Sequence, residues 1–342
     1  MTDHLPARVD DAPLLPDQFD HELRVRLAAL DTASDTHAAD QRPDNTTRAY
    51  AADWKSWQAF CTQFGIPVTA ATRGTLRAFV DYLWNHEPRA YTTIDRKLAG
   101  ITVTLRRPPY NLILNPDDTA AARELLKDYR RKAERAGEPP RGRGKAPAMR
   151  LITLREIVAK CDTSIFGHRD RAMLLLGFAI AARRAELAGL RLHNICDDDN
   201  GLLIHVRVSK TDPRTVPVPY GSHPDTCPVR AWKAWAEAAH ITDPDKHAFR
   251  RIHHTGAVQP HGLSPQRAGD IITAAGLRAG CEELFTGHSV RSGLATEARR
   301  QGKDRKAIAA ITGHKENSKV LDGYMQVVDR WSEEDNALVG LM

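Results

Sequence analysis

Residues 169–187 read RDRAMLLLGFAIAARRAEL, and they join a long apolar run directly to two arginines and a glutamate. From residue 172 to residue 181 every side chain is apolar or absent. A run that is apolar on all faces is typical of a helix buried in a core. The stretch therefore predicts a buried helix over 169–181 that ends with Arg183, Arg184 and Glu186 at the edge of a core.

Around this helix the sequence predicts a mostly helical domain with a small sheet, over residues 151–342. Leu202–Val208 and Thr215–Val218 flank a polar turn, which is typical of a two-stranded hairpin. The sequence TLRE at Thr153–Glu156 matches a capping box and is expected to begin the first helix. Further helices are expected near 228–239, 265–278, 289–300, 304–312 and 317–326, with a terminal helix over 328–341.

An all-α domain is predicted before it, over residues 44–136. Tyr50, Trp54, Trp57 and Phe60 recur at spacings of four, three and three, which places them on one face of a helix. Three more helices are expected, near 75–85, from 93 to the pair Pro108-Pro109, and around 125–129. Residues 1–43 are expected to be a flexible arm that includes a short helix, and the basic, Pro- and Gly-rich residues 137–150 a linker.

The composition favours a cytoplasmic protein that binds nucleic acid. The 342 residues carry a net charge of +6, and a basic protein is attracted to polyanions. The five cysteines are scattered without a Cys-x-x-Cys pair, which fits reduced thiols and argues against a disulfide scaffold or a zinc site. Residues 1–40 are polar and acidic, and no apolar window reaches about 18 residues, so neither a signal peptide nor a membrane span is predicted.

Five short motifs follow one another along residues 151–342. Each of them alone is common by chance, but their order and spacing together are not. They are Arg183-x-x-Glu186, Lys210 in the turn between the two strands, His288-x-x-Arg291, Gly313-His314, and Tyr324 ten residues after that histidine.

These residue types suit cleavage of a phosphodiester without a metal ion or another cofactor. The transition state concentrates negative charge on the non-bridging oxygens, and two guanidinium groups can grip those oxygens in place of a metal. A phenol has a pKa of about 10 and needs help to lose its proton near neutrality. Nearby cations and His288 can give that help, and a lysine in a hairpin turn is a candidate general acid for the oxygen that leaves.

The order of the motifs resembles that of the tyrosine recombinase, or phage integrase, family. The likeness extends to Cre-like recombinases through the Trp-rich helix, Leu203-Ile-His-Val206 and Gly287-His-Ser289. It implies a site-specific DNA recombinase of bacterial, phage or plasmid origin, which works without metal or ATP through a 3′-phosphotyrosyl intermediate. The implied site consists of Tyr324 as the nucleophile, Arg183, Arg291 and His314 on the transition-state oxygens, His288 as the proton acceptor, Lys210 as the general acid, and Glu186 behind the arginines.

Two positions depart from the Cre-like pattern. Cre-like proteins often carry Trp where this chain has His314, although His is the commoner residue across the wider family. Ala181-Ala182 stands where a Gly-Leu pair is usual. The Arg-x-x-Glu spacing selects Arg183, and the second departure leaves Arg184 as the alternative.

The resemblance also implies a two-domain clamp on double-stranded DNA that carries an inverted-repeat site. Four protomers would assemble on two such sites, and the segment 328–341 would dock into a neighbouring protomer, with packing on its own domain as the alternative. Phosphate contacts position such an enzyme, and base contacts set its sequence preference. The expected DNA contacts are Thr92, Thr93, Arg96, Lys97, Arg141, Arg143, Lys145 and Arg214.

Two other functions stay open from the sequence. A type IB topoisomerase uses similar chemistry to relax supercoils as a monomer, although the all-α domain and the linker argue against it. A DNA-binding protein descended from a recombinase would lack catalysis, although the presence of every motif residue argues against that decay.

Overall fold

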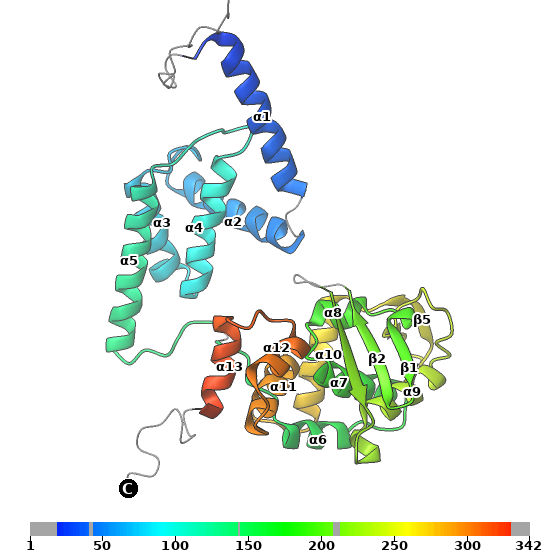
Figure 1. Ribbon diagram of the computed structural model, residues 1–342. Coiled ribbons are helices and arrows are strands. Elements are labelled where there is room, and N and C mark those ends of the chain that lie inside the picture. Colours follow the sequence, from blue (N-terminus) through cyan, green and yellow to red (C-terminus); the bar gives the residue numbers. More distant parts are fainter. Residues whose placement is uncertain (1–18, 41–43, 143, 208–212, 330–342) are drawn as a thin grey trace, which may run out of the picture. The chain divides into compact units, whose positions relative to one another are not determined.

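The computed structural model describes residues 19–40, 44–142, 144–207 and 213–329, which belong to two compact units (Figure 1). Unit 1 is Met1–Gly144 and unit 2 is Lys145–Met342, and each has its own apolar core. The division falls inside the segment 137–150 that the sequence predicts as a linker. Among the helices that the described residues form, none is both long and apolar enough to cross a membrane.

The described residues of unit 1 form helices joined by turns and loops, and no strand. Its elements are α1 (His21–Asp40), α2 (Asp44–Gln63), α3 (Arg73–Asp81), the π-helical turn η2 (Tyr82–His86), α4 (Tyr91–Leu105) and α5 (Pro116–Arg135). Helices α2 to α5 correspond to the four helices that the sequence predicts, whereas α1 is longer than the short helix expected there. Side chains fix two of the helix starts, because Thr72 accepts a hydrogen bond from the backbone of Thr75 and Asn115 accepts one from Asp117.

The apolar core of unit 1 packs around a tryptophan of α2. Trp57 is fully buried, and its ring centroid lies 5.6 Å from that of Phe60 and 5.2 Å from that of Phe79. Its indole N–H donates to the carbonyl oxygen of Val68 at 2.9 Å, so the ring is oriented as well as buried. Leu98 of α4 belongs to the same cluster. The predicted apolar stripe of α2 therefore faces inward, against α3 and α4.

Unit 2 surrounds one buried helix, α7 (Ile165–Ala179). Its other helices are α6 (Leu151–Ala159), α8 (Arg184–Gly189), η3 (Leu192–Asn194), η4 (Pro224–Thr226), α9 (Pro228–Ala238), α10 (Pro265–Arg278), α11 (Ser289–Arg300), α12 (Arg305–Thr312) and α13 (Lys319–Asp329). An antiparallel sheet of order β1-β2-β3 is formed by Ile195–Asp198, Gly201–Val206 and Arg214–Pro219. A separate hairpin pairs β4 (Arg250–Ile252) with β5 (Val258–Gly262). The sequence predicts β2 and β3 but neither β1 nor this hairpin.

The end of α7 differs from the prediction in a way that shapes the site. The helix stops at Ala179, and Ala181 adopts a left-handed backbone with φ +47°, so the chain turns away from the helix axis. A new helix, α8, then begins at Arg184. The arginine pair and Glu186 therefore begin a helix instead of ending one.

The start of α6 also differs from the prediction. The helix begins at Leu151, and no capping box forms at Thr153. The reason is a tertiary contact, because the backbone N–H of the fully buried Met149 donates to the carbonyl oxygen of Ser289 at 3.0 Å. This bond fixes the direction of the chain before the predicted cap is reached.

The close approach of Met149 to α11 gives a stability prediction. A Cβ at Gly293 of α11 would lie 2.2 Å from the carbonyl oxygen of Met149, whereas a Cβ at Gly177 of α7 would meet Leu187 at an ordinary 3.4 Å. We expect Gly293→Ala to lower the free energy of unfolding by about 1–3 kcal/mol. Gly177→Ala is the matched control, and it should change stability by less than about 1 kcal/mol or raise it. Chemical denaturation measures both, and equal effects would contradict the close approach.

Candidate active site

The two predicted histidines, one arginine and the tyrosine come together where α11, α12 and α13 pack side by side (Figure 1). His288 directly precedes α11 and Arg291 lies in its first turn, while His314 follows α12 and Tyr324 lies on α13. The three helices share a small apolar cluster, separate from the main core, made of Ala295, Ile308, Ala309, Leu321, Tyr324 and Met325.

The phenol of Tyr324 is paired with an imidazole. Its Oη lies 2.5 Å from Nε2 of His288, and the residue is only 3% exposed. Burial raises the pKa of Tyr324 above its usual value, and the charges of Arg291 and Arg183 oppose that rise. Desolvation of the ring, followed by the charges of Arg291, Arg183 and Lys145, lowers the pKa of His288. The proton therefore rests on the tyrosine near neutral pH, and the neutral imidazole can accept it.

Arg291 is an almost completely buried cation that backbone carbonyl groups orient. It is 1% exposed, and it donates to the carbonyl oxygen of Ala181 at 2.8 Å and to that of Thr312. Burial and the charge of Arg183 lower its pKa to about 10, so it keeps its charge at neutral pH. Both carbonyl groups belong to turns at helix ends, and the turn at Ala181 exists because α7 stops early.

His314 completes the group of side chains around the phenol. Its Nε2 lies 3.2 Å from Nη2 of Arg291, its Nδ1 lies 2.9 Å from Oγ1 of Thr312, and its ring centroid is 6.0 Å from that of Tyr324. Gly313 makes the turn that brings the ring here, since its φ of +63° is left-handed. Burial, followed by the charges of Arg291 and Arg183, lowers the pKa of His314 to about 4.

Glu186 holds two arginines through its buried carboxylate. Oε1 accepts from the guanidinium of Arg183 at 2.5 Å, and Oε2 accepts from the backbone N–H of Arg183 at 3.0 Å. Arg214 of β3 donates to both oxygens, at 3.2 and 2.8 Å. Burial alone would raise the pKa of Glu186, but the hydrogen bonds from the two arginines and the charge of Arg214 lower it to about 2.

The geometry separates Arg183 from its neighbour Arg184. Arg184 is exposed, and its guanidinium donates to the side chain of Gln266 on α10 at 3.2 Å. Arg183 is half-buried, and its charge acts on Tyr324 and on both histidines. Of the two arginines, Arg183 is therefore the one beside the phenol.

The comparison with known families identifies the class of enzyme to which this site belongs. The sequence pattern of the phage integrase family matches residues 149–330. This chain belongs to the phage integrase family. The match covers more than half of the chain and contains the whole group around Tyr324. The protein is a tyrosine-type site-specific recombinase that acts on DNA.

Relatives of known sequence or structure agree with this family. An integrase/recombinase XerD homologue of Selenomonas ruminantium is 28% identical over 303 residues, which cover 87% of this chain and 85% of the relative. A lambda integrase fragment, solved as a dimer bound to a COC′ core site, shares the fold with a TM-score of 0.56 at 13% identity, covering 90% of this chain and 96% of the fragment. A Tn1549 transposon integrase, solved with transposon right end DNA, gives a TM-score of 0.58 at 12% identity, covering 89% of this chain and 95% of that one.

Arg214, one of the predicted phosphate contacts, is buried beside Glu186. Its side chain is 7% exposed, and beyond Glu186 it donates to the carbonyl oxygens of Ile311 at 2.8 Å and Ile180 at 3.1 Å. These bonds direct the guanidinium into the protein, and its contact with a phosphate stays a prediction. The predicted residues Lys210 and Arg143 lie outside the described residues.

The predicted DNA contacts at the start of α4 divide into two groups. Thr92 is exposed, Thr93 is half-buried, and the side chain of Arg96 is 42% exposed. Lys97 is buried, with Nζ 3.7 Å from a carboxylate oxygen of Asp53, and its contact with DNA stays a prediction. The fully buried Asp53 also accepts a hydrogen bond from Arg96 at 2.5 Å. It therefore orients Arg96, the member of this pair that reaches solvent.

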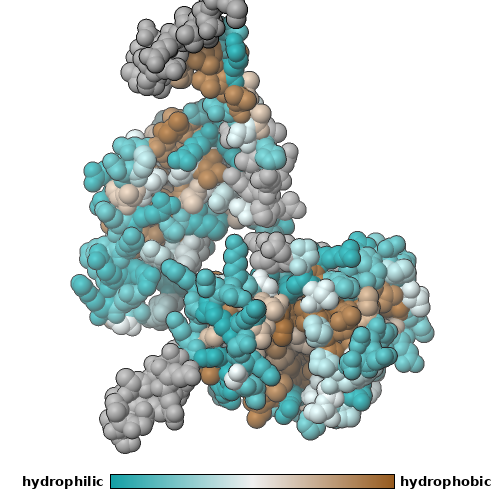
Figure 2. Space-filling model, viewed as in Figure 1, coloured by the Kyte–Doolittle hydropathy of each residue, from teal (hydrophilic) through white to brown (hydrophobic). Residues whose placement is uncertain are grey.

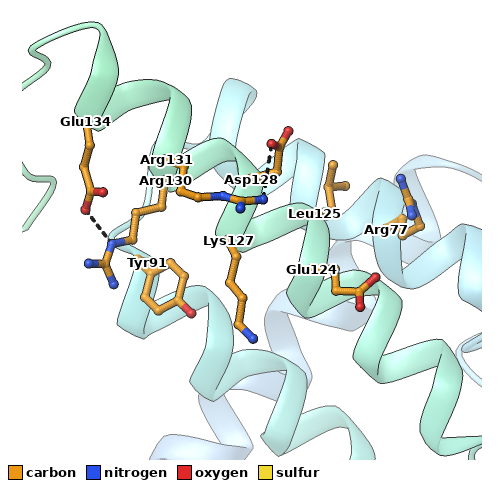
Figure 3. A pocket seen from close by; sticks show the side chains of 9 residues that line it. All are labelled: Arg77, Tyr91, Glu124, Leu125, Lys127, Asp128, Arg130, Arg131 and Glu134. Carbon is orange, nitrogen blue, oxygen red and sulfur yellow. Dashed lines mark hydrogen bonds and ion pairs between the residues drawn. The ribbon is translucent and has the colours of Figure 1, made fainter.

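A charged groove of about 710 Å³ lies beside these residues on unit 1 (Figure 3). It is lined by Arg77 of α3, Tyr91 of α4, and Glu124, Leu125, Lys127, Asp128, Arg130, Arg131 and Glu134 of α5. The guanidinium of Arg130 stands 5.2 Å from the ring centroid of Tyr91. Hydrophilic side chains cover this end of α5 in the space-filling view (Figure 2). The cations of α5 are visible in the sequence as a charge run, but only the fold brings Arg77 and Tyr91 beside them.

The two predicted linker contacts that the structure describes, Arg141 and Lys145, differ in their surroundings. Arg141 folds back onto unit 1, where it stacks 4.0 Å from the ring centroid of Trp84 and donates to the carbonyl oxygen of that residue at 2.5 Å. Lys145 is exposed and lies at the start of unit 2, where its Nζ donates to the carbonyl oxygen of Gly323 at 2.7 Å. Across the described ranges, no group of three or more His, Cys, Asp or Glu side chains is arranged to hold a metal ion.

The low pKa of Glu186 gives a prediction about stability and pH. The folded-state pKa of about 2 lies below the ordinary 4.5, so the ionised carboxylate stabilises the fold fully above about pH 5 and loses this effect as the pH falls toward 2. The difference corresponds to about 3 kcal/mol. We expect the free energy of unfolding of Glu186→Gln to be lower than that of the unchanged chain at pH 7 by about this amount. At pH 3 the difference between the two free energies should be smaller.

Urea denaturation at the two pH values tests this prediction. Glu134→Gln removes an exposed carboxylate that pairs with Arg130, and it sets the baseline for a surface glutamate. A gap between Glu186→Gln and the unchanged chain that is the same at both pH values would rule out the buried ion pair as its cause.

Proposed function

We propose that Tyr324 attacks a phosphodiester of one DNA strand, forming a 3′-phosphotyrosyl bond and freeing a 5′-hydroxyl group. The observation that carries the proposal is the pairing of the Tyr324 phenol with His288 at 2.5 Å, within the field of Arg183 and Arg291. A buried tyrosine that only packs in a core has no need of an imidazole partner and two cations. Here they lie around the one atom that must lose a proton and attack.

The cations supply the charge that the transition state needs. Arg291 and Arg183 are held in place by backbone carbonyl groups and by Glu186, so little reorganisation is needed when a phosphate arrives. Guanidinium groups neutralise the non-bridging oxygens without a metal ion. His314 joins them. Without a phosphate, burial and the charges of Arg291 and Arg183 lower the pKa of its imidazole. A bound phosphate is negative and favours the charged form of this imidazole.

Two proton transfers complete the cleavage. The neutral His288 accepts the phenolic proton as the oxygen–phosphorus bond forms. Lys210 is assigned from the sequence motif alone as the acid that protonates the leaving 5′-oxygen. The covalent phosphotyrosyl bond keeps the energy of the broken phosphodiester, so a 5′-hydroxyl group of a partner strand can reverse the reaction without ATP.

The same proposal covers how the enzyme meets its DNA. The exposed Thr92 and Arg96 and the cations of the groove on α5 would contact phosphates of a duplex that carries inverted repeats. Each protomer would bind one repeat, and four protomers would join two sites in the cytoplasm. The lambda integrase dimer on its core site is the precedent for two protomers on one site.

Replacement of the nucleophile tests the chemistry. Tyr324→Phe should bind DNA with unchanged affinity and form no covalent adduct, because the ring that packs in the small cluster stays and only the attacking oxygen is lost. A denaturing gel with a nicked suicide substrate measures the adduct, and a binding assay with the same duplex is the control. An adduct formed by Tyr324→Phe would remove Tyr324 from this role.

Two further results would contradict the proposed function. One is relaxation of supercoiled plasmids without any required site. The other is specific binding by the unchanged chain with no adduct under any condition.

Assembly of four protomers is tested by shortening the chain. Removal of residues 330–342 leaves α13 whole, including Asp329, which binds Arg299 of α11 at 2.6 Å. We expect the shortened protein to bind one site normally and to fail to bring two sites together. Native gels with one and with two labelled sites measure this, and unchanged synapsis would contradict a role of the segment in assembly.

A further inference from the structure

The first residues of unit 2 run along the helix that carries Arg291. Met149 is fully buried and bonds to Ser289, and its carbonyl oxygen lies so close to Gly293 that a side chain would not fit there. Arg150 follows, with Nε 3.7 Å from a carboxylate oxygen of Glu297. Ser289, Gly293 and Glu297 are all on α11. The segment is therefore seated on α11 before α6 begins.

The other end of this segment reaches the helix of the nucleophile. The ammonium of Lys145 donates to the carbonyl oxygen of Gly323 at 2.7 Å, and it lies 4.9 Å from the ring centroid of Tyr324. A Cβ at Gly323 would come within 3.3 Å of the same nitrogen, so the absence of a side chain there leaves room for the lysine. Its charge also acts on His288, the partner of the phenol.

The electrostatics of this contact change during the reaction. A cation is attracted weakly to the face of a neutral aromatic ring and much more strongly to the same ring once it carries a negative charge. The Lys145 ammonium thus stabilises the phenolate more than the phenol. Arg183 and Arg291 also favour the phenolate, but they are committed to Glu186 and to backbone carbonyl groups, and the scissile phosphate will take up part of their charge. Lys145 comes from a different segment than these two arginines, and its ammonium lies at the face of the Tyr324 ring.

We propose that Lys145 is a positioning residue for strand cleavage, which holds the turn of α13 at Gly323 and stabilises the Tyr324 phenolate as it attacks. The inference rests on the proposed role of Tyr324. The sequence predicts Lys145 as a phosphate contact. The inference gives this side chain a second function, which is to contact the helix and the ring of Tyr324.

Three substitutions separate charge from hydrogen bonding. Lys145→Gln keeps an N–H group that can donate to the Gly323 carbonyl but removes the charge, whereas Lys145→Arg keeps both. Lys303→Gln, at an exposed lysine in the turn between α11 and α12, is the control for loss of one positive charge. Thermal unfolding of each variant shows whether the fold is intact.

The measurement is the single-turnover rate of adduct formation on a nicked suicide substrate, with enzyme at saturating concentration, from pH 5.5 to pH 9. We expect Lys145→Gln to be slower by roughly tenfold throughout this range, because the pKa of Tyr324 lies above it and loss of the ammonium lowers the phenolate fraction by the same factor at each pH. Lys145→Arg and Lys303→Gln should keep the rate and the pH profile of the unchanged chain.

Two results would overturn the inference. The first is an unaltered saturated rate for Lys145→Gln, including one that accompanies weaker DNA binding. The second is a Lys145→Arg variant as slow as Lys145→Gln. The proposed function fails in a different way, which is an adduct formed by Tyr324→Phe or no adduct formed by the unchanged chain.

Discussion

One buried carboxylate, that of Glu186, determines where positive charge can lie in unit 2. It binds Arg183 at the start of α8 and Arg214 on β3, and Arg214 also binds carbonyl groups that precede α8 and end α12. Three elements distant in sequence are thereby tied to a single group. A buried ion cluster of this kind tolerates loss of one member poorly, because the charges that remain are left without partners in a medium that solvates them weakly. Catalytic geometry and local stability therefore depend on the same bonds.

The site is organised for an anion before one arrives. Arg291 and Arg183 lie close together, and each donates to oxygen atoms of the protein. Burial, followed by the charges of neighbouring cations, lowers the pKa of Arg291 to about 10 and that of His314 to about 4. Both shifts store an electrostatic cost that a bound phosphate relieves. Preorganised charge of this type favours the transition state because the protein does not have to rearrange as negative charge develops.

The sequence predicts local features well and long-range pairings poorly. The helices of unit 1 follow from the spacing of residues such as Trp57, and the buried α7 from its unbroken apolar run. The order of the motifs identifies Tyr324, His288 and Arg291, which the fold brings together as expected. No local signal shows that α7 stops at a left-handed Ala181, since alanine is a strong helix former.

Charge alone also fails to show which cations face solvent. Lys97 and Arg214 look like surface residues in the sequence, but buried carboxylates distant along the chain bind both of them. The hairpin of β4 and β5 escapes prediction because its strands are short and partly exposed, so they lack an apolar alternation. Such features depend on partners that only the folded chain supplies.

Tyr324, the proposed nucleophile, lies on a helix that is attached to the enzyme by few apolar side chains. Helix α13 packs through the six-residue cluster that includes Tyr324 itself, and this cluster is separate from the large core around α7. The remaining attachments are polar, such as the bonds from Arg299 to Asp329 and from Arg305 to Asp322. Detachment of α13 would leave that large core intact, so its opening requires less free energy than global unfolding. Tyr324 could in this way move with α13 while the large core around α7 stays folded.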